Sequence, residues 1–218
     1  MTVRKTLTGF EHRYDPGFED APVLILLHGT GGDEDDLIPL GKALLPRAAR
    51  LSPRGRVLEL GAPRFFRRLA AGVFDQEDLA RRTKELARFI REAFPAYSLE
   101  GRRTIVVGFS NGANIAASML LSGERVMDVA VLFRAMLPHE PQNLPKLEGL
   151  PVLLSSGRRD PIVPAGSVER LEHLLKESGA SVTLNWDQGV HGLGPEPVGA
   201  ARDWLEKTLR SLEGTQSK

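Results

Sequence analysis

The chain has 218 residues, a formal net charge of +1 and no cysteine. This length suits one domain covering residues 1–218, and the missing cysteine excludes a disulfide framework, a thiolate metal site and a cysteine nucleophile. Its 41% hydrophobic and 26% charged residues are typical of a globular protein, and the balanced charge gives no general reason to bind nucleic acid.

The longest apolar run near the start of the chain, residues 23–27, is too short to cross a bilayer. No apolar run of signal-peptide length follows the first residues. We therefore expect a cytoplasmic protein with no membrane insertion.

Apolar runs of strand length alternate along the chain with amphipathic segments of helix length. The runs that are typical of strands buried on both faces occupy 23–27, 104–107, 129–133 and 152–155. The more alternating run at 181–186 suits an outer strand.

Helical patterns lie between these runs. The first is opened by Asp75, with Asp78 three positions on as in a cap, and is stopped by Pro95. Three more patterns cover about 111–121, 168–175 and 198–209. The alternation predicts an α/β fold with a mostly parallel central sheet and helices on both faces, in which ligands bind beyond the carboxyl ends of the strands.

A glycine-rich segment, His-Gly-Thr-Gly-Gly at 28–32, follows the first buried strand. Glycines let backbone N–H groups face a ligand, so this loop can supply a donor to an oxyanion. A phosphate cradle is the rival interpretation, but the Gly-Lys-Ser/Thr ending of such loops is missing.

Four acidic residues at 33–36 come next and invite a metal-binding interpretation. They precede an apolar helical pattern, and negative charge at a helix N-terminus accounts for them without an ion. The sequence has no zinc-type spacing of His and Glu, and the EF-hand glycine is missing. We expect no metal and no cofactor.

An arginine- and phenylalanine-rich segment lies between a strand expected near Val57 and the helix that starts near Asp75. Its members are Arg64, Phe65, Phe66, Arg67 and Arg68. These residues could line a substrate pocket, with aromatic rings against an acyl or aryl group and an arginine on a carboxylate. The alternative is a solvated arginine run with Phe65 or Phe66 packed into the core.

Gly-Phe-Ser-Asn-Gly at 108–112 fits the Gly-x-Ser-x-Gly nucleophile elbow, with a buried strand before it and an alanine-rich helix after it. The sharp turn holds the serine in strained backbone geometry, and side chains at the glycine positions would collide with neighbouring backbone. Ser110 is therefore the candidate nucleophile; alternatively, the glycines only shape the turn and Ser110 caps the helix. The backbone N–H groups of Thr30 and Asn111 are the natural oxyanion donors.

A serine hydroxyl needs a base to take its proton, and the chain has five histidines. We choose His191, because it follows the strand that ends near Trp186 and lies in a flexible Gly-Val-His-Gly loop at the expected active edge. The others lie before the serine, in a proline-rich loop or within a helical pattern: His12, His28, His139 and His173.

The base in turn needs a carboxylate to fix its tautomer. Asp160 follows the strand at 152–155 and gives the chain order Ser, Asp, His that is found in α/β-hydrolases. Asp187 is the competitor, but it lies only four residues before His191, a position more typical of a turn residue.

Four segments together resemble the carboxylesterase/phospholipase group of α/β-hydrolases, which is related to dienelactone hydrolases and acyl-protein thioesterases. They are 27–32, 108–112, 157–163 and the pair His191-Gly192. The resemblance covers nearly the whole chain. It implies an α/β-hydrolase fold and a serine esterase with Ser110, Asp160 and His191 as the triad.

The sequence also departs from these relatives. Dienelactone hydrolases carry a cysteine nucleophile, which this chain lacks. Asn111 stands where the thioesterases usually have Gln, and Val190 rather than Gly precedes the histidine. The resemblance therefore does not identify the substrate.

The connection between the strands at 129–133 and 152–155 is about seventeen residues, too short for a lid domain, so we expect an open site for small esters. The expected activity is hydrolysis of carboxylic esters through an acyl-serine intermediate. The alternatives are a lysophospholipase, an acyl thioesterase, or a non-catalytic binding protein. The expected partner is a small-molecule ester and not nucleic acid; an exposed outer strand or helix could support a homodimer, which nothing in the sequence requires.

Overall fold

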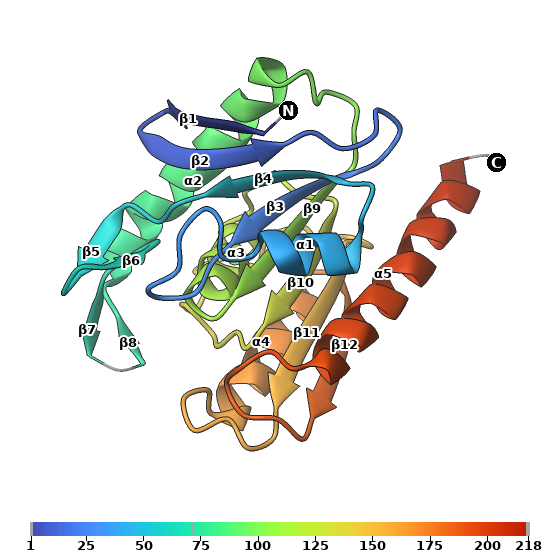
Figure 1. Ribbon diagram of the computed structural model, residues 1–218. Helices are drawn as coiled ribbons and strands as arrows, with labels where there is room; N and C mark the ends of the chain where they lie inside the picture. The colour runs from blue at the N-terminus through green and yellow to red at the C-terminus, as the bar shows by residue number, and fades with distance from the viewer. Residues whose placement is uncertain (1, 71, 217–218) are drawn as a thin grey trace.

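A computed structural model describes residues 2–70 and 72–216 of the protein (Figure 1). The strands of its central eight-stranded sheet are β1 (Val3–Leu7), β2 (Phe10–Asp15), β3 (Val23–Leu27), β4 (Ala49–Pro53), β9 (Thr104–Phe109), β10 (Val129–Phe133), β11 (Pro151–Gly157) and β12 (Ser181–Asp187). They lie in the order β1-β2-β4-β3-β9-β10-β11-β12, so β12 is an outer strand as predicted.

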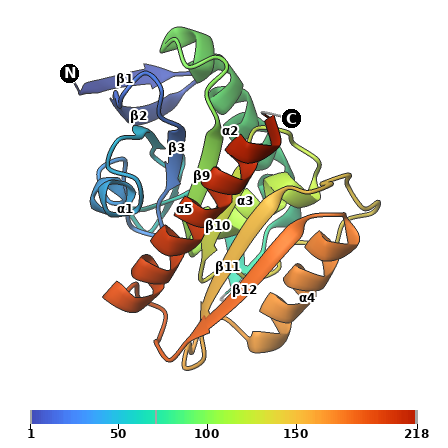
Figure 2. The same ribbon diagram turned by 90° about the vertical axis from the view of Figure 1, so that its right-hand side faces the viewer.

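Helices cover both faces of this sheet. They are α1 (Ile38–Leu44), α2 (Gln76–Ala96), α3 (Asn111–Leu121), α4 (Ala165–Glu177) and α5 (Pro195–Gln216). α2, α3 and α4 lie on one face, and α1 and α5 lie on the other (Figures 1 and 2). Their apolar side chains belong to two separate buried clusters, one on each face. The predicted α/β class is therefore confirmed.

The sheet is mostly parallel. Strands β4, β3, β9, β10, β11 and β12 run parallel to one another, while β1 pairs with β2 and β2 with β4 in antiparallel fashion. In β3, the side chains of Val23, Ile25 and Leu27 belong to the apolar cluster under α2, α3 and α4. Leu24 and Leu26 belong to the cluster under α1 and α5. A strand that is covered on both faces needs an apolar residue at every position, which is why its sequence is continuously apolar.

The sequence pattern did not predict the antiparallel end of the sheet. β1 and β2 form a hairpin whose turn residues, Thr8 and Gly9, both have positive φ (50° and 80°), as type I′ turns require. The middle of β1 is Arg-Lys-Thr and is exposed. Because one face of this outer strand is solvated, no apolar run marks it.

Two small hairpins lie between β4 and α2. β5 (Val57–Glu59) pairs with β6 (Ala62–Arg64), and β7 (Arg68–Ala70) pairs with β8 (Val73–Phe74). The strand expected near Val57 is β5, which belongs to this separate hairpin rather than to the central sheet.

The boundaries of α2 follow the predicted signals. Asp75 is the N-cap residue, and its side chain accepts a hydrogen bond from the Asp78 amide at 3.0 Å. Pro95 falls in the last turn, just before the helix ends at Ala96.

The acidic run at 33–36 was expected at a helix N-terminus, and it lies directly before α1 rather than in its first turn. α1 begins only at Ile38, and the described first turn of this helix contains no acidic residue. The run forms turns before the helix, where Glu34 pairs with Arg54 at 2.5 Å and Asp35 pairs with Arg13 at 2.8 Å. Arginine side chains therefore compensate the charges of Glu34 and Asp35.

Residues 134–150, which are all described and connect β10 to β11, contain neither helix nor strand. No large lid therefore covers the sheet at this connection. In the part of the chain that the structure describes, no helix combines the length and the hydropathy that crossing a membrane requires.

Candidate active site

Ser110 stands in the turn between β9 and α3 with φ 52° and ψ −114°. Residues other than glycine rarely adopt this conformation, which costs about 1–3 kcal/mol. The flanking glycines make the turn possible: a Cβ on Gly108 would lie 2.6 Å from Ala113 backbone atoms, and one on Gly112 would lie 2.0 Å from the Leu27 oxygen. The Ser110 amide also donates to Phe133 O at 2.9 Å, which ties the turn to β10.

The Ser110 hydroxyl does not cap the helix. Ser110 occupies the N-cap position of α3, yet its side chain makes no capping hydrogen bond. Its Oγ lies instead 2.8 Å from Nε2 of His191, in the loop after β12.

His191 joins the serine to Asp160, which lies in the loop after β11. Its Nδ1 is 2.8 Å from Asp160 Oδ2. A carboxylate can only accept, so Nδ1 carries the proton and donates to Asp160, and Nε2 is left to accept the Ser110 hydroxyl proton. The ring of Phe109 packs near the imidazole, with centroids 5.5 Å apart.

The carboxylate of Asp160 is buried and held on both sides. Its side chain is 1% exposed, against 20% for His191. Oδ1 accepts hydrogen bonds from the amides of Ile162 at 2.8 Å and Val163 at 3.1 Å, while Oδ2 faces His191. These contacts fix the carboxylate where it can orient the imidazole.

The competing candidates lie in other surroundings. Asp187 forms a buried ion pair with Arg134 at 2.6 Å. His12 is buried in β2, where burial lowers its pKa and where its ring contacts the Tyr97 hydroxyl at 2.5 Å. The two remaining histidines outside the glycine-rich loop contact Ser122 or a residue of their own helix: His139 and His173.

The glycine-rich loop at 28–32 is held by its own histidine. His28 Nδ1 donates to Gly29 O at 2.6 Å, and Nε2 accepts from the Gly55 amide at 2.9 Å. The contact with the Gly55 amide requires a neutral ring, and burial lowers the pKa of His28. The Gly31 and Gly32 amides donate to Pro63 O and Gly29 O, so these two N–H groups are occupied.

The segment around β6 contacts the side chains of Thr30 and Asn111, the two residues whose amides are the expected oxyanion donors. Arg64 Nη1 donates to the Thr30 hydroxyl at 2.9 Å. The Phe65 amide donates to Asn111 Oδ1 at 2.8 Å. Sequence reasoning missed both contacts, which join residues that are 34 and 46 positions apart in the chain.

The structure does not gather the side chains at 64–68 around a shared pocket. Phe65 and Phe66 are buried in the core, at 2% and 0% exposure. Arg64 and Arg68 both pair with Glu59, at 3.0 and 2.8 Å, and Arg67 pairs with Asp75 at 2.6 Å. Each of the three guanidinium groups therefore already has a carboxylate partner within the chain.

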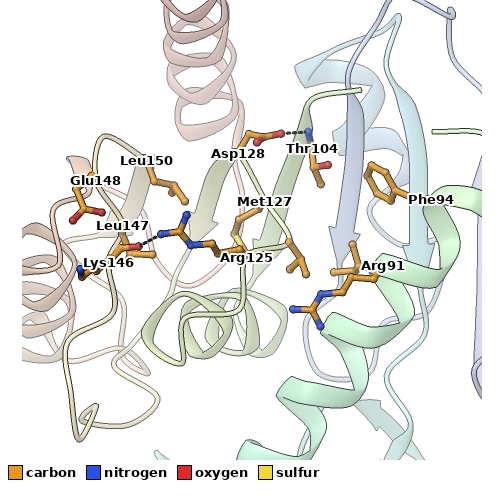
Figure 3. Close-up of a pocket in the computed structure, with 12 residues that line it drawn as sticks. Arg91, Phe94, Thr104, Arg125, Met127, Asp128, Lys146, Leu147, Glu148 and Leu150 are labelled. Carbon is orange, nitrogen blue, oxygen red and sulfur yellow. Dashed lines mark hydrogen bonds between the residues drawn. The ribbon is translucent and has the colours of Figure 1, made fainter. Parts of the chain in front are cut away.

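Figure 3 shows a cavity of about 590 Å³ whose lining includes none of Ser110, Asp160 and His191. It is lined by residues near the starts of β9 and β10, such as Thr104 and Asp128, and by Phe94 of α2, whereas Ser110 follows the end of β9. Within the described residues, no group of three or more His, Asp and Glu side chains is placed to hold a metal ion.

The chain is similar to proteins of known type over most of its length. A family model described as phospholipase/carboxylesterase matches residues 14–209. The protein MhqD of Bacillus subtilis (strain 168) is 45% identical over 199 residues, which cover 91% of this chain and 99% of that protein.

Solved structures of carboxylesterases are also similar to this chain. The carboxylesterase of Bacillus cereus superimposes with a TM-score of 0.88 at 44% identity, covering 91% of this chain and 94% of that one. A carboxylesterase from Mesorhizobium loti superimposes with a TM-score of 0.86 at 30% identity, covering 94% and 98% of the two chains. The fold is thus of the α/β-hydrolase type.

Proposed function

The chain belongs to the phospholipase/carboxylesterase family, and from this premise we propose that it is a serine carboxylesterase that hydrolyses small carboxylic esters through an acyl-serine intermediate. The observation that carries the proposal is the continuous relay from Ser110 Oγ to His191 Nε2 and from His191 Nδ1 to Asp160 Oδ2, with both distances 2.8 Å. A hydroxyl, an imidazole and a carboxylate in this order are what acyl transfer to serine requires.

In the acylation step, Ser110 Oγ attacks the ester carbonyl carbon while its proton moves to His191 Nε2. The carbonyl oxygen becomes an oxyanion, which the amides of Thr30 and Asn111 stabilise. The intermediate collapses by breaking the bond to the alkoxy oxygen, and His191 gives its proton to the leaving alcohol. Asp160 keeps the imidazole in the required tautomer and stabilises its charged form.

In the deacylation step, water takes the place of the alcohol. His191 removes a proton from the water as its oxygen attacks the acyl carbon, and the same amides hold the second oxyanion. Breaking the acyl–Oγ bond releases the carboxylic acid, and the proton returns to Ser110. The enzyme then has the structure with which it began.

The surroundings of the relay favour an ester that is small or that extends into solvent. The connection at 134–150 carries no helix or strand that could close over the serine. Two apolar side chains beside the relay, Ile162 and Val190, are each 55% exposed. They offer an apolar rim to an acyl or alcohol group.

A fluorophosphonate probe tests the serine. We expect it to label the wild-type protein at Ser110 and to leave Ser110→Ala unlabelled. A folded wild-type protein that is not labelled would overturn the proposal and favour a binding protein.

A substrate panel then tests the class of ester. p-Nitrophenyl esters of increasing chain length are compared with an acyl-CoA and a lysolipid, each with Ser110→Ala as the blank. We expect the highest kcat/KM for short p-nitrophenyl esters. A clear preference for the acyl-CoA or for the lysolipid would instead assign an acyl thioesterase or a lysophospholipase.

A further inference from the structure

Arg134 is a buried arginine in an unusual backbone conformation, immediately after β10. Its φ is 55°, in the region that favours glycine, and its side chain is 1% exposed. The guanidinium binds Asp187 at the end of β12 through two hydrogen bonds, Nη1 to Oδ2 at 2.6 Å and Nη2 to Oδ1 at 3.0 Å. The two residues are 53 positions apart in the chain.

This ion pair holds both ends of the loop that carries His191. At the start of the loop, Asp187 Oδ1 accepts the Gly189 amide at 2.7 Å. At its end, Arg134 Nη2 donates to Gly192 O at 3.1 Å. A Cβ on Gly189 would lie 2.5 Å from Asp187 Oδ1, so the loop packs against the pair without room for a side chain there.

Different hydrogen bonds hold the two contacts of the relay, that of Asp160 with His191 and that of His191 with Ser110. The loops of Asp160 and His191 continue the β11–β12 pairing, because the Arg158 amide donates to Asp187 O at 2.9 Å and the Arg159 amide to Gly189 O at 3.1 Å. These bonds set the position of Asp160 relative to His191.

The serine is attached to the neighbouring strand. The Ser110 amide donates to Phe133 O at 2.9 Å, and Phe133 is followed directly by Arg134. The Arg134 guanidinium therefore connects the strand that holds the serine turn directly to both ends of the His191 loop.

The pair is an inefficient way to stabilise the fold. Taking two charges out of water costs about as much as their attraction returns, and an apolar pair of similar volume is often as stable or more so. The left-handed backbone of Arg134 adds a further cost. What such a pair supplies is a fixed geometry, because a planar guanidinium with two parallel bonds to a carboxylate allows few orientations.

We infer that Arg134, held by Asp187, is a positioning residue that sets the distance between His191 Nε2 and Ser110 Oγ. The inference rests on the proposed esterase function. It assigns to Arg134 an effect on the rate of acylation through His191, without contact to the substrate.

The test compares three variants with the wild-type protein. Arg134→Met removes the guanidinium, and we expect kcat to fall about 10- to 100-fold with KM within about twofold, since a displacement of about 1 Å can cost 10²-fold. Asp187→Asn is the conservative variant: its amide oxygen can still accept from Gly189 and from one guanidinium N–H, so we expect most of kcat to be kept. The double variant Arg134→Met/Asp187→Leu replaces the pair by apolar side chains, so we expect stability near the wild-type value but a low kcat.

Arg50→Met is the matched control, because Arg50 is also buried and lies beside a carboxylate, 4.0 Å from Asp15, but belongs to β4. We expect this variant to lose stability without the selective fall in kcat. Amide hydrogen exchange supplies a readout besides activity: exchange at 187–192 should be faster in Arg134→Met than in the wild-type protein and unchanged in Arg50→Met.

Two results would overturn the inference. One is a folded Arg134→Met protein with wild-type kcat and wild-type exchange at 187–192. The other is a double variant that regains kcat together with stability, since the pair would then be purely structural. Failure of the proposed function would look different, because the wild-type protein would neither hydrolyse esters nor react with the fluorophosphonate.

Discussion

Arg64 of the β5–β6 hairpin donates a hydrogen bond to the Thr30 hydroxyl at 2.9 Å, although Arg64 is 3% exposed and already paired with Glu59. The contact fixes the residue whose backbone N–H we assign to the oxyanion. Burial lowers the pKa of Arg64, but an arginine keeps its charge throughout the range in which an esterase works. The guanidinium thus stays charged and holds the glycine-rich loop in position through Thr30.

Removing the hydrogen bond between Arg64 and Thr30 should slow the hydrolysis of every ester alike. Loss of one oxyanion donor costs about 10²–10³ in kcat, so a displaced Thr30 amide in Arg64→Met should lower kcat by about tenfold. Thr30→Val, which keeps the amide but removes the hydroxyl, should have the same effect, whereas Thr30→Ser should keep the wild-type rate. Steady-state kinetics on a neutral and an acidic ester of equal length measure kcat and KM for each variant.

The acidic ester separates this role from direct substrate binding. If Arg64 bound a substrate carboxylate, Arg64→Met would raise KM for the acidic ester alone, and Thr30→Val would leave that KM unchanged. Arg67→Ala is the control, because Arg67 lies in the same segment but pairs with Asp75 on the surface. It should behave as the wild-type protein on both esters.

Asp160→Asn should inactivate the enzyme without unfolding it. The Asn oxygen can still accept from the Ile162 and Val163 amides, but its NH₂ group would face His191 Nδ1 and force the tautomer in which Nε2 is protonated. That nitrogen can no longer accept the Ser110 proton, so kcat should fall by about 10³–10⁴-fold.

Asp128→Asn is the matched control for this substitution. Asp128 also accepts a backbone amide, that of Thr104 at 2.7 Å, but at the opposite end of the sheet. It should keep kcat. Near-wild-type hydrolysis by folded Asp160→Asn would remove the carboxylate from the mechanism.

The parallel half of the sheet could be predicted because each of its strands carries its own signal. A strand such as β3 or β10 is apolar at every position, since helices cover both of its faces. Each such run ends at the carboxyl edge of the sheet, and the loops that follow parallel strands meet at this edge. This is why Ser110, Asp160 and His191 could be chosen from sequence alone, although the sequence contained no information about their distances.

The contacts that support these loops could not be predicted. The bond from Arg64 to Thr30 and the pair of Arg134 with Asp187 join residues 34 and 53 positions apart, and each depends on how separate elements pack. Arg134 follows an apolar strand, where one more charged residue gives no sign of being buried. The type I′ turn at Thr8 and Gly9 was a local signal that the alternation of apolar runs obscured.

Gly112→Ala should destabilise the protein strongly. Its Cβ would lie 2.0 Å from Leu27 O and 2.6 Å from His28 O, which are backbone atoms of the central strand and its loop. Relief requires α3 to move away from β3, so the free energy of unfolding should fall by more than about 2 kcal/mol.

Gly199→Ala is the control, because this glycine lies within α5 and, apart from its chain neighbours and the backbone of its own helix, a Cβ on it would meet no described atom within 4 Å. It should raise the free energy of unfolding by about 0.5–1 kcal/mol through helix propensity. Urea unfolding measures both variants, and a Gly112→Ala protein as stable as the wild type would contradict the tight packing at the serine turn.

His28 should make the protein less stable in mild acid. In the folded protein its Nδ1 donates to Gly29 O and its Nε2 accepts from the Gly55 amide, so protonating Nε2 would set two N–H groups against each other. Burial lowers the pKa of His28 below its ordinary value of 6.5, whereas in the unfolded chain the ring titrates near that value. As pH falls through about 6.5 the unfolded state therefore binds more protons than the folded state, and stability decreases until the lowered pKa of the folded protein is passed. His12 is also buried, and burial lowers its pKa too, so it adds to the loss of stability as pH falls.

Urea unfolding between pH 8 and pH 5 measures the effect. The amide of Gln can offer one donor and one acceptor without titrating. The stability of His28→Gln should therefore decline less steeply with falling pH than that of the wild-type protein. Identical slopes for the two proteins would mean that His28 is free to protonate in the folded state, and that the glycine-rich loop does not depend on its neutral form.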